Sequence, residues 1–207
     1  MRAPVVEVLK RQPKEIALVA LARMGQMVVA FVYAAFFFTY GMQVVHVSRD
    51  FLLEVMLIAS FFSFFTIPFS GYLSDRIGRK QVYIFGAVTT GLFAFAYYAL
   101  LDTAVPGLIL LATLVAYFFH DLMWGPLAAL AAESFTPRLR YSGASIGFQL
   151  AAVFAGGPAP LIATAILAAT GSGQAIALYI FGCTIVSVVA TALLPSARDR
   201  DFARDHL

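Results

Sequence analysis

The amino-acid sequence predicts an all-α membrane protein of six transmembrane helices. Charged residues are 12% of the chain, against roughly 25% in soluble domains. Hydrophobic residues are 61%, and the mean hydropathy is +0.87. Apolar runs of about twenty residues recur, which is the length that crosses a bilayer as a helix. Because lipid offers no hydrogen-bond partner to exposed backbone groups, we expect every run to be helical.

Turn signals rich in glycine, proline and charge separate these apolar runs into six expected spans. In chain order the spans are Glu15–Gly41, Phe51–Leu73, Val82–Leu101, Pro106–Ala132, Ser142–Ala169 and Ala175–Leu194. The expected domain organisation is a tail of residues 1–14, a six-helix transmembrane bundle of residues 15–195 and a second tail of residues 196–207. Cys183 is the only cysteine, which excludes a disulfide within the chain.

The basic residues predict the orientation, because they gather on the cytoplasmic side of a membrane. One side of the predicted topology holds Arg49 alone. The other side holds Arg2, Lys10, Arg11, Lys14, Arg76, Arg79, Lys80, Arg138, Arg140, Arg198, Arg200 and Arg204. We therefore expect both termini to be cytoplasmic in a multi-pass protein of the cell (inner) membrane. The two sets of three spans then cross in opposite senses, so a 3+3 inverted repeat is expected.

The most informative motif, Gly-x-Leu-Ser-Asp-Arg-x-Gly-Arg-Lys, occupies the expected loop Gly71–Lys80. Gly71 would let another helix approach closely, and Asp75 would favour the positive N-terminus of the third helix. We interpret the motif as a conformational latch whose charge pairs hold one state and release in another. The alternative is a charged turn that only follows the positive-inside rule. The predicted latch residues are Gly71, Asp75, Arg76, Gly78, Arg79 and Lys80, with Glu133, Arg138 and Arg140 from the turn before the fifth span.

These motifs resemble those of a known group of transporters. The Gly71–Lys80 pattern resembles the cytoplasmic loop signature of the major facilitator superfamily. The stretch from Glu133 to Pro160 resembles its metabolite:proton symporter branch, and Pro4–Arg11 resembles the end of that branch's central cytoplasmic loop. The resemblance covers almost the whole chain, as the C-terminal six-span half of a twelve-span protein. It implies proton-coupled symport of an organic acid or a zwitterionic osmolyte.

Three ionisable residues are expected at membrane depth. Arg23 lies about 12 Å into the first span, and His120 and Asp121 lie on the order of 18 Å from the same side. Such groups are costly in lipid and face protein or water. The resemblance implies that the first and fourth spans line a central cavity. We therefore expect Arg23 and Asp121 to be neighbours, with Asp121 or His120 responding to protons. Alternatively, Arg23 holds a substrate carboxylate or extends its stem to the interface, and His120 bonds a neighbouring backbone.

Two glutamines complete the expected substrate and proton pathway, Gln26 and Gln149. In the symporter branch an acidic residue commonly follows the first-span arginine by three positions, and Gln26 holds that place here. If that carboxylate takes part in coupling, its replacement argues against proton symport by this chain. Alternatively, both glutamines only join helices.

A helix break is expected inside the fifth span, because proline removes a backbone donor and kinks a helix. Its residues are Gly156, Gly157, Pro158 and Pro160. The break is either a flexible point for rocking or a static kink accommodated by packing.

The predicted function is a half-length secondary active transporter that acts with a second six-helix half or a second copy of itself. The expected partners are the lipid bilayer and a small-molecule substrate, with no cofactor and the proton gradient as driving force. The alternative is a truncated, non-transporting remnant or a membrane interaction protein. Phosphate-binding, metalloprotease and hydrolase motifs are missing from the sequence, so we expect neither ATP-driven transport nor an enzyme. The basic residues flank the spans instead of clustering with exposed aromatics, so no nucleic-acid partner is expected.

Overall fold

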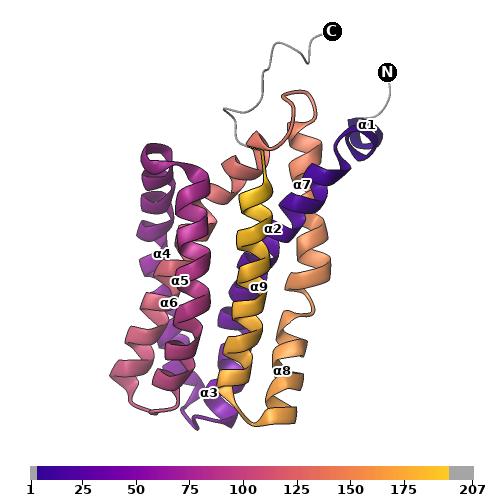
Figure 1. Ribbon diagram of the computed structural model, residues 1–207. Coiled ribbons are helices and arrows are strands. Elements are labelled where there is room, and N and C mark those ends of the chain that lie inside the picture. Colours follow the sequence, from indigo (N-terminus) through magenta and orange to yellow (C-terminus); the bar gives the residue numbers. More distant parts are fainter. Residues whose placement is uncertain (1–3, 196–207) are drawn as a thin grey trace.

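The computed structural model describes residues 4–195 as a bundle of long helices (Figure 1). Six of them are long and apolar enough to cross a membrane: Pro13–Gln43, Arg49–Ile77, Arg79–Leu101, Pro106–Glu133, Arg140–Thr170 and Gly173–Leu193. The six predicted spans are confirmed, each to within a few residues at its ends. The predicted tail 196–207 and the basic residues Arg2, Arg198, Arg200 and Arg204 lie outside the described residues.

Two of the six spans contain a π-helical segment. The first span comprises α2 (Pro13–Phe31), the π-helix η1 (Val32–Phe36) and α3 (Phe37–Gln43). The fifth comprises α7 (Arg140–Ala151), the π-helix η2 (Ala152–Gly156) and α8 (Ala159–Thr170). The other spans are α4 (Arg49–Ile77), α5 (Arg79–Leu101), α6 (Pro106–Glu133) and α9 (Gly173–Leu193).

Local sequence signals explain several helix ends. The Ser48 hydroxyl accepts a hydrogen bond from the Phe51 amide at 3.3 Å, which caps the first turn of α4. Pro106 occupies the first position of α6, where a missing N–H costs nothing. Gly171, with φ +64°, ends α8 in the left-handed conformation, and Ser172 caps α9.

The expected loop Gly71–Lys80 is mostly helical, so that prediction is wrong. Helix α4 continues to Ile77 and α5 begins at Arg79, which leaves Gly78 alone between them. Its φ of +122° is a conformation that L side chains rarely adopt. Asp75 therefore belongs to the last turn of α4 and does not lie in a loop before α5. The predicted end of the second span, Leu73, marks where the polar residues begin, and α4 continues beyond that residue to Ile77.

The packing of the spans follows the expected inverted repeat. The first span packs on the fifth as the fourth packs on the second, and the first packs on the sixth as the fourth packs on the third. The third and sixth spans, α5 and α9, pack on each other. The main contacts between spans are therefore the same when spans one to three are exchanged with spans four to six. This pairing is what a pseudo-two-fold axis in the membrane plane would produce.

The α5–α9 pair is continuous, whereas the other four spans are interrupted. Helices α5 and α9 carry no internal proline or π-helical segment. In contrast, α4 contains Pro68, α6 contains Pro126, and the first and fifth spans contain η1 and η2. The predicted break is confirmed in position, because η2 ends at Gly156 and α8 begins at Ala159. Such irregularities are the usual places where a helix bends.

Ahead of the first span, α1 (Pro4–Arg11) forms a short helix packed on α7 and α2. Val8 is fully buried against the same cluster as Phe135 and Leu139, in the α6–α7 turn. The part of the predicted tail 1–14 that the structure describes is thus packed on the bundle. In Figure 1, α1 lies at the same end as the last turns of α9. We call this end of the bundle the α1 end.

A glycine contact brings α4 and α6 into backbone proximity, although not through Gly71. A side chain built on Gly71 would meet nothing within 4 Å, so its predicted role in close approach is wrong. Gly125 of α6 makes the approach instead. A Cβ there would overlap the Ser70 hydroxyl and lie 2.7 Å from the Gly71 backbone nitrogen. The close approach of α4 and α6 therefore depends on Gly125 of α6 and not on Gly71 at the start of the motif.

Replacing Gly125 with alanine should destabilise the protein by about 1–3 kcal/mol, the usual cost of overpacking. The matched control is Gly182→Ala in α9, where a new Cβ would meet nothing within 4 Å. Thermal unfolding in detergent, followed by size-exclusion chromatography, measures the difference. Equal midpoints for the two variants would contradict the tight contact between α4 and α6.

Candidate functional site

Arg79 joins three helices at the α1 end. Its guanidinium pairs with Asp75 of α4 at 3.0 Å and with Glu133 at the end of α6. Arg79 itself begins α5, so one side chain links the ends of α4, α5 and α6. The pairing of a motif arginine with Glu133 is the arrangement that a latch between the two turns requires.

The remaining cations of the first motif have other partners. Lys80 donates to the backbone carbonyls of Ala192 at 2.6 Å and Leu194 at 3.0 Å. These carbonyls lie at the C-terminus of α9, where a cation is favoured by the helix dipole. The Arg76 guanidinium stacks 4.6 Å from the Tyr72 ring centre and is exposed. Lys80 therefore extends the cluster to α9, whereas Arg76 does not join it.

The turn between α6 and α7 is held mainly by α1. Glu7, itself largely buried, pairs with Arg138 at 3.2 Å and with Arg11 at 3.4 Å. Arg140 has a buried Nε atom without a hydrogen-bond partner in the part of the chain that is described. Of the nine predicted latch residues, the structure thus brings together Asp75, Arg79 and Glu133, while Arg138 is bound by a glutamate that the prediction did not include.

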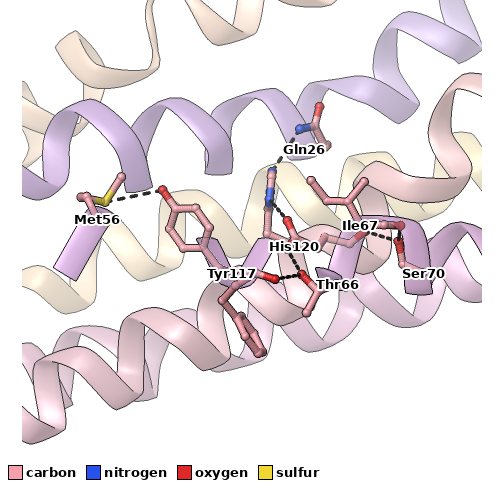
Figure 2. A network of polar contacts seen from close by, with 9 residues as sticks. Gln26, Met56, Thr66, Ile67, Ser70, Tyr117 and His120 are labelled. Atoms are coloured by element: carbon pink, nitrogen blue, oxygen red, sulfur yellow. Dashed lines mark hydrogen bonds and ion pairs between the residues drawn. The ribbon is translucent and has the colours of Figure 1, made fainter. Parts of the chain in front are cut away.

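A chain of polar side chains crosses the bundle at mid-depth and joins α2, α6 and α4 (Figure 2). The Gln26 amide lies 3.0 Å from His120 Nε2. The other ring nitrogen, Nδ1, lies 3.3 Å from the Asp121 carboxylate. The second carboxylate oxygen accepts a hydrogen bond from the Thr66 hydroxyl. Asp121 is 1% exposed, so these contacts replace the water that its carboxylate would otherwise need.

The structure does not place Arg23 beside Asp121, and that prediction is wrong. The Arg23 guanidinium lies 3.9 Å from the centre of the Phe148 ring on α7. On a helix, residues three apart point about 60° away from each other. Gln26 faces α6, so Arg23 is turned towards α7. The position of a residue along a span does not determine the side of the helix on which it lies.

The other predicted pathway and break residues lie on the fifth span. Gln149 is exposed on α7 and lines a shallow apolar groove with Leu150, Val153 and Phe154, away from the Asp121 network. The Gly157 amide donates to the Ala152 carbonyl at 2.9 Å, which closes the last wide turn. Pro158 then precedes α8 as its N-cap residue, and Pro160 lies in the first turn of α8.

Thr66 and Ser70 were missed by sequence reasoning. Ser70 donates to the Asp121 backbone carbonyl at 2.8 Å, one turn from the Thr66–Asp121 contact. A signal was present, because the buried face of α4 carries small hydroxyl residues at helical spacing: Ser63, Thr66, Ser70 and Ser74. Such a stripe inside an apolar helix indicates a polar partner on the neighbouring helix. The ion pair of Glu7 with Arg138 was missed as well.

Comparison with known proteins agrees with this arrangement. The family described as sugar (and other) transporter matches residues 4–200. The chain belongs to this family. Within it, the shikimate transporter of Escherichia coli (strain K12) is 30% identical over 200 residues, which cover 95% of this chain and 46% of that protein. The Klebsiella pneumoniae citrate-proton symporter is 30% identical over 179 residues, 82% of this chain and 40% of its own length.

The matches also show how much of each relative's length this chain covers. The ectoine/proline transporter of Corynebacterium glutamicum is 29% identical over 138 residues, which cover 65% of this chain and 27% of that protein. The chain thus spans about half the length, or less, of the curated relatives it matches. No solved structure gives a significant match. The predicted resemblance to a half of a major facilitator superfamily transporter, in its metabolite:proton symporter branch, is confirmed.

Removing the Arg79–Glu133 ion pair should reveal a coupling energy of about 0.5–1 kcal/mol in a double-mutant cycle of Arg79→Gln and Glu133→Gln. The cycle of Arg79 with Asp75 should give a smaller value, because the Asp75 side chain is 63% exposed and that of Glu133 only 33%. Unfolding midpoints in mixed micelles measure both. A larger coupling to Asp75 would contradict the assignment of Glu133 as the main partner.

Proposed function

We propose that this chain is one half of a proton-coupled symporter for a small carboxylic or zwitterionic metabolite. It works in the inner membrane with both termini cytoplasmic, needs no cofactor and uses the proton gradient as its driving force. The observation that carries the proposal is the buried chain from Gln26 through His120 and Asp121 to Thr66. The family membership and the symporters among the relatives support the same reading.

The network can exchange one proton without exposing a charge to lipid. When Asp121 is ionised, its two oxygens accept from the Thr66 hydroxyl and from the His120 ring. When the Gln26 amide donates a hydrogen bond to Nε2 of His120, the proton of the neutral ring lies on Nδ1, which faces the carboxylate. When a proton binds Asp121, the carboxyl group can donate to Thr66, whose hydroxyl also lies 3.4 Å from the Phe62 carbonyl. Protonation thus changes the bonds between α6 and α4.

The position of Gln26 bears on the acidic residue that the symporter branch commonly has at this place and that this chain lacks. Gln26 contacts Nε2 of His120 and the Asp121 carboxylate lies beside Nδ1, so a carboxylate at residue 121 bonds the same imidazole ring as one at residue 26 would, from its other side. In this proposal Asp121 supplies the proton-binding carboxylate and Gln26 orients His120. Ionisable groups at such depth mark proton and substrate pathways.

A second six-helix half is proposed to cover α4 and the fifth span. Only 28% of the membrane-crossing window of each is buried, compared with 61% for the first span. These two spans are equivalent in the inverted repeat, so their exposed faces belong to related positions on the bundle. Alternating access needs a second bundle against which this one can rock. The relatives, which are about twice as long, have room for such a bundle in the same chain.

Asp121→Asn should abolish proton-dependent uptake, because an amide cannot exchange the proton, while the hydrogen bonds to Thr66 and His120 can be kept. The experiment follows labelled shikimate, citrate and betaine in cells, with and without a protonophore. The chain is expressed alone and together with a second half taken from a relative. Asp50→Asn, at the exposed start of α4, is the matched control. Unchanged uptake in Asp121→Asn removes this residue from the mechanism. No uptake by any combination favours a non-transporting remnant.

The orientation is tested by single cysteines at Lys80, Arg140 and Arg49 in a Cys183→Ser background. A membrane-impermeant maleimide should label positions 80 and 140 only from the cytoplasmic side, and position 49 only from the outside. The basic residues at the α1 end favour this outcome through the positive-inside rule. Labelling of positions 80 and 140 from opposite faces would overturn the six-span topology itself.

A further inference from the structure

Arg23 is a cation at membrane depth without an anionic partner. It forms no ion pair with any of the described side chains, whereas Arg79 and Arg138 each have a carboxylate. Its recorded contacts are the Phe148 ring at 3.9 Å and the Met27 sulfur, also at 3.9 Å. Its Nε atom is buried and has no hydrogen-bond partner. The surroundings therefore hold the guanidinium in place but leave its donors largely unused.

The Phe148 ring satisfies only the face of the guanidinium. Stacking over an aromatic ring attracts the positive charge, but it provides no acceptor for the N–H groups at the edge of the plane. Those groups form a rigid fork that matches the two oxygens of a carboxylate. A buried donor without an acceptor costs free energy, and a charged group costs more than a neutral one. A carboxylate bound at the terminal Nη groups would supply the acceptors that the described residues do not offer there.

The Arg23 site adjoins the proposed proton site through one turn of α2. Arg23 and Gln26 are three residues apart, a rise of about 4.5 Å along the helix axis. Gln26 contacts His120, which contacts Asp121. A ligand anion at Arg23 and a proton at Asp121 would therefore act on adjacent surfaces of the same turn, without direct contact between the two charged residues.

We propose that Arg23, supported by Phe148, is the subsite that binds the carboxylate of the transported metabolite. This inference rests on the proposed function for its ligand class but not for the proton step. The carboxylate pairs with the N–H edge of the guanidinium, and no covalent bond changes. Phe148 is a positioning residue that keeps the guanidinium plane fixed on α7, so the site includes both α2 and the broken fifth span.

The test is chemical protection of Arg23 in the wild-type chain, reconstituted in vesicles without any ion gradient. Phenylglyoxal modifies arginines, and peptide mass spectrometry reads each position separately. Shikimate or citrate should slow modification of Arg23 by roughly tenfold at a concentration about ten times the dissociation constant. Arg76, stacked on Tyr72 but exposed, is the internal control and should not be protected. The methyl ester of shikimate, which lacks the carboxylate, should protect neither arginine.

Two further arms separate the alternatives. Lipid phosphate is the other oxyanion within reach of a flexible arginine, so the vesicles are made with and without phosphatidylglycerol. Slow modification that follows the lipid composition and not the carboxylate would overturn the substrate subsite. So would equal protection by the acid and its ester, or protection by neither carboxylate. Phe148→Leu should reduce the protection at Arg23. Asp121→Asn should retain it, so loss of proton coupling and loss of the anion subsite give different results.

Discussion

A carboxylate buried at mid-membrane depth must be surrounded by donors, and this requirement organises the bundle. Asp121 finds its donors on two elements, the Thr66 hydroxyl of α4 and the His120 ring of its own helix. One turn further along the same face of α6, Gly125 lets the α4 backbone approach at Ser70 and Gly71. The short hydroxyl side chains of α4 can reach Asp121 because this glycine keeps the two helices close. The polar contact and the close packing therefore depend on each other.

The helix irregularities divide the bundle into one uninterrupted helix pair and four interrupted spans. The α5–α9 pair is uninterrupted and is fixed by close contacts such as Gly91 against Phe181 and Thr184. Each of the other spans carries an internal proline or a π-helical segment. A transporter half that bends needs such segments where backbone hydrogen bonds are already weakened. The uninterrupted α5–α9 pair would then provide the support against which the other helices move.

Hydropathy predicts most of the fold, since the lipid requirement acts on whole segments of about twenty residues. The six spans and their order follow from that pattern, whereas the break after Gly156 follows from the glycines and prolines there. The end of α4 does not, because charged residues continue a helix into water as readily as they end it, and only Gly78 stops it. The site shows the same limit. Depth places Arg23 and Asp121 at similar levels, but the rotation of α2 decides their partners, and no apolar pattern fixes that rotation in a helix that is buried on several sides.

The helix pairs differ in how many side-chain contacts join them. This difference bears on how the proposed proton site and the proposed anion subsite are coupled. Helices α4 and α6 are joined at Asp121, between the Tyr117 hydroxyl and the Met56 sulfur, and again through Arg79 at the α1 end. Between α2 and α6 the recorded side-chain hydrogen bond is the one from Gln26 to His120. In the proposed mechanism, a change in the protonation of Asp121 changes the group that faces the His120 ring. The hydrogen bond between His120 and Gln26 then transmits that change to α2. Arg23 lies on the same turn, so a small rotation of α2 moves its guanidinium relative to Phe148. Coupling would then be carried by the orientation of one helix, which explains why the anion subsite and the carboxylate can function together without lying within ion-pair distance.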